Sequence, residues 1–147
     1  MDNPGHLQNR AGGRLFVYGT LRKGFRSHGL LLRCRPRFLG KGHVCGELYD
    51  FGEYPGAAEG KSEWARVEGE LYWLPRAEVA FKVLDSFEGY DHTRPALDGF
   101  ERKETIVSMA NGDEIRAWIY WLSRKRASGH RIPSGNYAQH PKWVPRI

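Results

Sequence analysis

The sequence has few of the residues that would cross-link the chain or hold it in a membrane. Its 147 residues include two cysteines, Cys34 and Cys45, whose spacing fits no C-x-x-C pair. Two cysteines are too few for a disulfide framework, so we expect two free thiols, as in a reducing cytoplasm. No apolar run approaches the roughly 20 residues that span a bilayer, and residues 1–13 lack the apolar segment of a secretory signal. We therefore expect a cytoplasmic protein with a flexible tail over residues 1–13.

The sequence also lacks the patterns of metal sites and of common nucleophiles. Its six histidines form no group with the spacing of metal ligands, and the pair His43-x-Cys45 is too sparse to hold an ion. Ser86 lies between Asp85 and Phe87, outside the Gly-x-Ser-x-Gly context of a nucleophile elbow. We expect neither a metal nor another cofactor.

Glycine, proline and positive charge are present in quantity. The chain has 18 glycines and 8 prolines, which predict many turns and a β-rich fold of a single domain. The formal net charge is +6, and residues 22–41 contain seven Lys or Arg residues and no acid. Such an excess can attract nucleic acid, acidic membranes or anionic metabolites, and it also keeps small proteins in solution. Only Phe25 and Phe38 accompany these charges, so the interleaved aromatics of nucleic-acid binders are missing and we do not expect nucleic acid as the partner.

Apolar periodicity and turn residues give the expected elements. One helix is expected from Pro75 to Glu88, with Ala80, Val83, Leu84 and Phe87 as its apolar stripe and Gly89 as its end. Residues 106–110 and 114–121 form a hairpin around Asn111-Gly112. The other expected elements are strands at residues 15–18, 38–49 and 67–74, a helical turn at residues 30–32 and a turn at residues 51–56. The fold class is α+β: a small, mostly antiparallel curved sheet or β-barrel with one main helix and short helical turns. We expect the domain to span residues 14–122 and a basic, irregular tail, residues 123–147, to pack on it.

The first expected strand ends in a loop that can bind an anion. Residues 18–21 read Tyr-Gly-Thr-Leu, and the N–H groups after the strand have no ladder to join. An anionic ligand group would satisfy them, although a simple turn at Gly19 explains the same residues. A phosphate loop is excluded, because Phe25 and Arg26 follow Gly24 where Lys and then Ser or Thr would stand.

Four motifs together resemble one family. They are Tyr18-Gly19-Thr20-Leu21; Gly46-Glu47-Leu48-Tyr49 with Tyr54-Pro55-Gly56; Leu84-Asp85-Ser86-Phe87-Glu88-Gly89-Tyr90; and Ala117-Trp118-Ile119-Tyr120. Over residues 14–122 the chain resembles the γ-glutamylcyclotransferase-like family, which includes AIG2-like proteins and γ-glutamylamine cyclotransferases. The resemblance implies the α+β fold and a small-molecule γ-glutamyl substrate. It also implies a reaction without metal that closes a γ-glutamyl amide to 5-oxoproline and releases an amine.

The resemblance assigns the candidate site residues. Glu88 matches the catalytic Glu of the family and would be the general acid/base. The substrate-binding residues would be Tyr18, Gly19, Thr20, Leu21, Tyr54 and Tyr120. Independently of the resemblance, a carboxyl at a helix C-terminus beside aromatic rings should have a raised pKa, although an ordinary solvated Glu at a helix end also fits the sequence.

Two departures from the family concern the choice of amine. Phe100 stands where many relatives have a Tyr, and Gly135-Asn136-Tyr137 stands where many have Gly-Asp-Trp. The alternative function is a non-enzymatic module that binds anionic ligands or nucleic acid through residues 22–41 and the basic tail. The sequence gives no indication of the oligomeric state.

Overall fold

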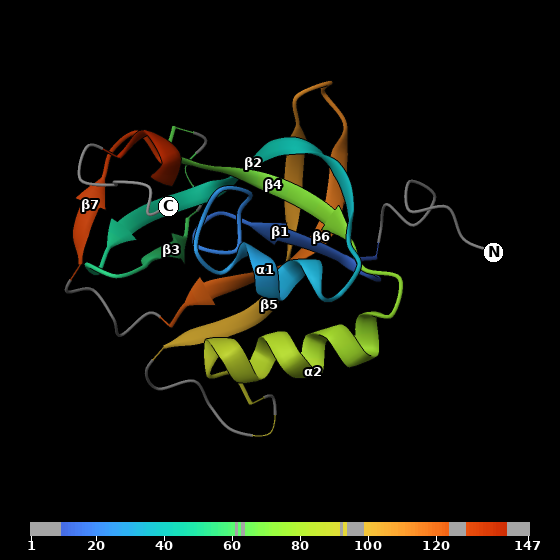
Figure 1. Cartoon of the computed structure of the whole chain (residues 1–147). Coiled ribbons are helices and arrows are strands. Elements are labelled where there is room, and N and C mark those ends of the chain that lie inside the picture. Colours follow the sequence, from blue (N-terminus) through green and yellow to red (C-terminus); the bar gives the residue numbers. More distant parts are fainter. Residues whose placement is uncertain are drawn as a thin grey trace.

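The computed structural model describes residues 10–60, 62, 64–91, 93, 99–123 and 129–140. Within these ranges the chain forms seven strands, two α-helices and one 3₁₀ turn (Figure 1). In chain order these are β1 (Arg14–Val17), α1 (His28–Leu32), β2 (Arg37–Asp50), β3 (Pro55–Glu59), β4 (Arg66–Trp73), α2 (Ala77–Glu88), β5 (Phe100–Met109), β6 (Glu114–Leu122), β7 (His130–Ile132) and η1 (Tyr137–Gln139). The α+β class expected from the sequence is confirmed.

Five strands close into a barrel. The order is β2-β4-β1-β6-β5, and pairing of Gly42 and His43 with β5 closes the ring. Neighbours are antiparallel except β1 and β6, which pair in parallel. The long strand β2 extends beyond the barrel, so its second half carries β3 on one edge and β7 on the other. The pairing of β2 with β4 contains a register shift between Phe38 and Gly40.

Alternate residues of the barrel strands face two separate cores. Phe16, Ala117 and Ile119 point into the barrel interior. Leu15 and Val17 point outward, where α1 and α2 cover the strands (Figure 1). Successive side chains of the barrel strands therefore alternate between the two cores with a period of two, and both faces are buried where α2 packs.

Helix α2 buries a different face from the one expected. Ala80, Phe81 and Leu84 are buried, whereas Val83 and Phe87 are 45% and 48% exposed. The stripe Ala80, Val83, Leu84, Phe87 was therefore wrong at two of its four positions. Because Phe81 is the residue that packs inward, the buried face runs through positions 77, 80, 81, 84 and 88. The same rotation turns Glu88 toward the barrel.

The prediction missed two strands. The turn expected at residues 51–56 gives way to β3 from Pro55 onward, and β7 lies in the segment expected to be irregular. Strand β7 pairs with β2 through Leu48 and Ile132, and Ile132 is buried in the barrel core. A three-residue strand leaves no readable periodicity, so its sequence gave no signal. Residues 1–9, 124–128 and 141–147 of the two expected tails lie outside the described residues.

Candidate active site

A cavity of about 410 Å³ lies where the loop after β1 meets the C-terminal end of α2. The turn before β3, the start of β5 and the outer face of β6 complete its wall. The residues that the sequence proposed for the site all line this cavity: Tyr18, Gly19, Thr20, Leu21, Tyr54, Glu88 and Tyr120. The lining also includes Phe100, one of the two departures from the family pattern, together with Arg26 and Ser27, which the sequence had not indicated as site residues. Arg26 could not be singled out from the sequence, because it is one of seven Lys or Arg residues within residues 22–41.

The loop over residues 18–21 presents unpaired N–H groups. Its carbonyls are used, because Gly19 accepts from the Arg22 N–H and Thr20 from the Ser27 N–H, both at 3.0 Å. The N–H groups of Gly19, Thr20 and Leu21 meet no acceptor in the part of the chain that is described. Buried N–H groups without a protein partner are uncommon, and a bound anion or carbonyl oxygen would satisfy them.

A glycine is required at the start of this loop. A Cβ on Gly19 would lie 2.6 Å from Cγ of Pro55, at the start of β3. The missing side chain lets the loop and the turn before β3 approach each other, which brings two walls of the cavity together.

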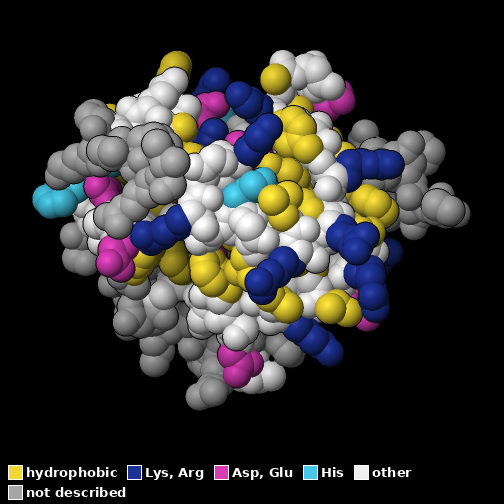
Figure 2. All heavy atoms as spheres, in the orientation of Figure 1, with side chains coloured by type: hydrophobic (Ala, Val, Ile, Leu, Met, Phe, Trp, Pro, Cys, Tyr) yellow, Lys and Arg dark blue, Asp and Glu magenta, His cyan; other side chains and the backbone are white. Residues whose placement is uncertain are grey.

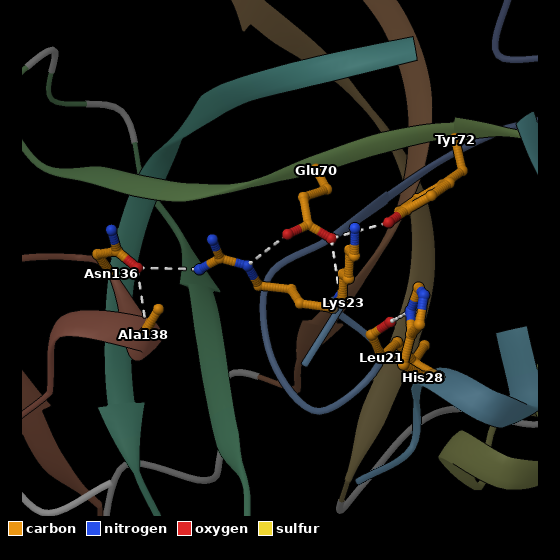
Figure 3. A network of polar contacts seen from close by, with 8 residues as sticks. Leu21, Lys23, His28, Glu70, Tyr72, Asn136 and Ala138 are labelled. Carbon is orange, nitrogen blue, oxygen red and sulfur yellow. Dashed lines mark hydrogen bonds and ion pairs between the residues drawn. The ribbon is translucent and has the colours of Figure 1, made fainter. Parts of the chain in front are cut away.

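A buried carboxylate holds the other end of the loop (Figure 3). Glu70 on β4 accepts from the Arg22 Nε at 3.3 Å and from the Lys23 N–H at 3.0 Å. It also accepts from the Tyr72 hydroxyl at 2.9 Å. Arg22 and Glu70 are each only 6% exposed, so either group would be left without its charge partner if the other were removed. The loop is thus fixed to the barrel directly after Leu21.

The C-terminal segment joins the same network. Arg22 Nη1 donates to Asn136 Oδ1 at 2.9 Å, and the Ala138 N–H donates to the same oxygen at 3.0 Å (Figure 3). Asn136 is one of the two departures from the family pattern, and here its amide oxygen accepts from a cation without adding a charge. On the other side, His28 Nδ1 lies 2.8 Å from the Leu21 carbonyl, which can only accept.

The Tyr18 hydroxyl is used within the protein. It donates to the Tyr120 carbonyl at 2.7 Å and accepts from the Ala57 N–H at 3.1 Å. Burial raises the pKa of this phenol far above its ordinary value. Tyr18 therefore joins β1 to β6 and β3, and its ring forms part of the cavity floor.

A second polar cluster lies behind the cavity. The Tyr120 hydroxyl donates to Asp85 Oδ1 at 2.6 Å, and Arg102 Nε donates to the same oxygen at 2.7 Å. The Arg102 guanidinium lies 4.3 Å from the ring of Phe81 and 4.5 Å from that of Trp118. These contacts join α2 to β5 and β6 and fix the last turns of the helix.

Glu88 ends α2 at the edge of the cavity. The next residue, Gly89, is left-handed with φ 74°, and its N–H and that of Tyr90 return to the Ser86 and Asp85 carbonyls. Burial raises the pKa of Glu88 to about 7. The charge of Glu88 in turn raises the pKa values of Tyr18 and Tyr120, which places the carboxyl near both phenols. Among the described residues it has no hydrogen bond or ion pair, so it is available to a ligand.

Other candidate chemistries have less support in the described ranges. They contain no group of three or more His, Cys, Asp or Glu side chains placed to hold a metal ion. Cys34 and Cys45 are free thiols, as expected. Neither described helix has the length and apolarity needed to cross a membrane.

The fold and the cavity define a small α+β barrel protein with a pocket for a small molecule at the end of its first strand. Residues 15–139 match the model of the family described as "Gamma-glutamyl cyclotransferase, AIG2-like". The chain therefore belongs to the AIG2-like γ-glutamyl cyclotransferase family.

Individual relatives agree with this assignment. A protein of Methanocaldococcus jannaschii named "Putative gamma-glutamylcyclotransferase" is 29% identical over 126 residues, which cover 86% of this chain and 96% of that protein. The γ-L-glutamyl-butirosin B γ-glutamyl cyclotransferase of Niallia circulans is 32% identical over 111 residues, 75% of this chain and 67% of that one. The crystal structure of an AIG2-like protein from Mus musculus superposes with a TM-score of 0.71 at 22% identity, covering 93% of this chain and 98% of the mouse chain. At that identity the mouse protein shows the fold alone.

Proposed function

We propose that the chain catalyses the cyclisation of a γ-glutamyl amide to 5-oxoproline with release of the amine. The α-amino nitrogen of the substrate attacks its own γ-carbonyl carbon and forms the C–N bond of a five-membered ring. The amide C–N bond then breaks, and the amine leaves with a proton. The reaction is intramolecular, so a site that holds the bent conformer removes much of the barrier.

Glu88 is the general acid/base in this proposal. Its carboxylate takes a proton from the α-ammonium group and returns it to the leaving amine. A pKa of about 7 suits both steps, since near neutrality the group is ionised in part of the molecules and protonated in the rest. Its lack of a partner among the described residues leaves it free to contact the substrate.

The loop over residues 18–21 binds the glutamyl half. The N–H groups of Gly19, Thr20 and Leu21 can donate hydrogen bonds to a carboxylate or to the oxyanion that develops on the γ-carbonyl. Tyr54 and Tyr120 line the same cavity and shape the pocket around the substrate.

The observation that carries the proposal is the meeting of two features in one cavity. A carboxyl with a raised pKa and a loop of unpaired N–H groups come from segments about 70 residues apart in the sequence, and the fold brings them together. The test is to incubate the purified protein with a panel of γ-glutamyl amides and measure 5-oxoproline and free amine by mass spectrometry. We expect both products in equal amounts from at least one amide. Release of glutamate instead would assign a hydrolase.

The alternative, a module that binds anionic ligands or nucleic acid, rests on the basic segment 22–41. Arg33, Arg35 and Lys41 are exposed, and Figure 2 shows Lys and Arg side chains spread over the face that carries α1. Arg22, however, is buried against Glu70 and is not available to a ligand. Binding through this face would weaken steeply with salt, whereas turnover in the cavity would not.

A further inference from the structure

One wall of the cavity is aromatic and supplies no group to the proposed proton transfer. Tyr54, from the turn before β3, and Phe100, at the start of β5, both line it. Their ring centroids are 5.9 Å apart at an interplanar angle of 60°, an edge-to-face pair. The ring of Phe51 also stacks against Tyr54, with centroids 5.7 Å apart at an interplanar angle of 22°. Two half-buried rings thus face the cavity from elements that supply neither Glu88 nor the anion-binding loop.

One cation stands beside this aromatic wall. Arg26 is the only Lys or Arg among the residues that line the cavity in the described part of the chain. Its Nη2 donates to the Glu53 carbonyl, so the guanidinium is tied to the residue before Tyr54. The described lining offers no second carboxylate that could bind a cationic amine. Glu88 is the only Asp or Glu in it, and in the proposed reaction Glu88 transfers the proton.

These observations point to the chemistry of the leaving amine. An aromatic or similarly flat group can pack on the rings of Tyr54 and Phe100. A second positive charge on the amine would approach Arg26 and would find no free carboxylate among the described lining residues to offset the repulsion. We infer, resting on the proposed function, that the preferred substrates are γ-glutamyl amides of ring-bearing amines that carry no positive charge in the leaving group.

Three amides of similar construction test the inference. γ-Glutamyl-phenethylamide carries a neutral ring, γ-glutamyl-ethylamide lacks the ring, and the mono-γ-glutamyl amide of 1,4-diaminobutane carries an ammonium. Aromatic pairs add about 0.5–1.5 kcal/mol beyond buried area, so kcat/KM for the phenethylamide should exceed that of the ethylamide by about tenfold. Unit charges of like sign near a protein surface repel by about 1 kcal/mol or more, so the diamine amide should lie about fivefold below the ethylamide.

Two substitutions separate the ring term from the charge term. Phe100→Leu keeps an apolar side chain but removes the ring, and it should reduce the phenethylamide-to-ethylamide ratio about fivefold. Arg26→Gln should raise the diamine-to-ethylamide ratio about fivefold and leave the phenethylamide ratio unchanged. Phe38→Leu and Arg33→Gln are matched controls, because both residues are exposed outside the cavity lining and should change neither ratio. Each ratio compares two substrates of the same variant, so any effect that a substitution has on the proton transfer by Glu88 cancels.

The outcomes distinguish this inference from the proposed function. If the three amides give 5-oxoproline at equal kcat/KM, or the diamine amide is best, the inference is wrong and the proposed cyclisation stands. If these and other γ-glutamyl amides give no 5-oxoproline, the proposed function fails and the inference falls with it. A preference for the phenethylamide that Phe100→Leu does not reduce would also overturn the assignment of the aromatic wall.

Discussion

Replacing Glu88 with Gln should lower turnover and raise stability, and the gain in stability should depend on pH. Glutamine keeps the size and much of the hydrogen bonding of a protonated carboxyl but cannot take up and return a proton. General acid–base catalysis contributes roughly 10²–10⁴-fold, so kcat for 5-oxoproline release should fall by that order. Substrate should still bind, because the N–H groups of residues 18–21 are untouched.

The stability effect follows from the raised pKa of Glu88. The group titrates at about 7 in the folded chain and at about 4.5 when unfolded. Below pH 4.5 the carboxyl is protonated in both states, and burial then carries no charge penalty. Between pH 4.5 and 7 the unfolded chain releases this proton first, so the wild type loses stability as the pH rises. The two pKa values differ by about 2.5 units (7 minus 4.5), and each unit corresponds to about 1.4 kcal/mol. The buried carboxylate therefore lowers the stability of the wild type at pH 8 by at most about 3 kcal/mol, which is the largest gain expected for Glu88→Gln.

Thermal melts at pH 5 and pH 8 measure this difference. Glu88→Gln should melt close to the wild type at pH 5 and several degrees higher at pH 8, since about 1 kcal/mol corresponds to 2–4 °C in chains of this size. Glu78→Gln, an exposed position at the other end of α2, is the control and should show no such pH-dependent gain. If the Glu88 variant turns over like the wild type, or its melting difference is the same at both pH values, the reasoning about Glu88 is refuted.

Substitutions at three other positions test the supports of the site. Glu70→Gln removes the charge that holds the loop after Leu21, so calorimetry should show a loss of about 3–5 kcal/mol in stability. In steady-state assays the same variant should raise KM more than it lowers kcat. Glu70→Asp keeps the charge and should recover part of the lost stability and part of the change in KM. Asp85→Asn should lower the free energy of unfolding in urea by about 1–3 kcal/mol, because Arg102 loses its charge partner, while kcat stays within a few-fold of wild type. A fall in kcat as large as that of Glu88→Gln would contradict a structural role for Asp85. Gly19→Ala places a Cβ 2.6 Å from Pro55 Cγ, so KM should rise with little change in circular dichroism, and an unchanged KM would contradict the close fit of loop and turn.

The sequence predicted the elements with strong periodicity. The hairpin around Asn111-Gly112 has a local cause, its turn residues, and it is present in the structure. The strand β3 was missed because it is short and begins inside the segment expected to be a turn. The strand β7 was missed because it is short and depends on pairing with β2, a partner distant in sequence. The buried face of α2 was misplaced for a related reason: periodicity shows which positions are apolar, and tertiary packing decides that Phe81 and not Val83 turns inward.

The candidate site was predicted through motifs, and its chemistry came only partly from the residues. The pKa of Glu88 could be argued from its helix end and aromatic neighbours, and burial raises it in the structure. The partners of Arg22 and the position of Arg26 could not be predicted, because they depend on β4 and on the turn before β3, which are far away along the chain. A sequence shows which residues are charged, whereas the fold determines which of those charges meet.

An isotope experiment tests the proposed cyclisation most directly. A γ-glutamyl amide that the protein accepts is incubated with it in H₂¹⁸O, and the acidic products are analysed by mass spectrometry. Intramolecular attack by the α-amino group brings no water oxygen into the product, so the account predicts unlabelled 5-oxoproline in equal amount to the released amine, and no product from the N-acetylated amide. Glutamate carrying ¹⁸O in its γ-carboxyl would show that water is the nucleophile and would contradict the account.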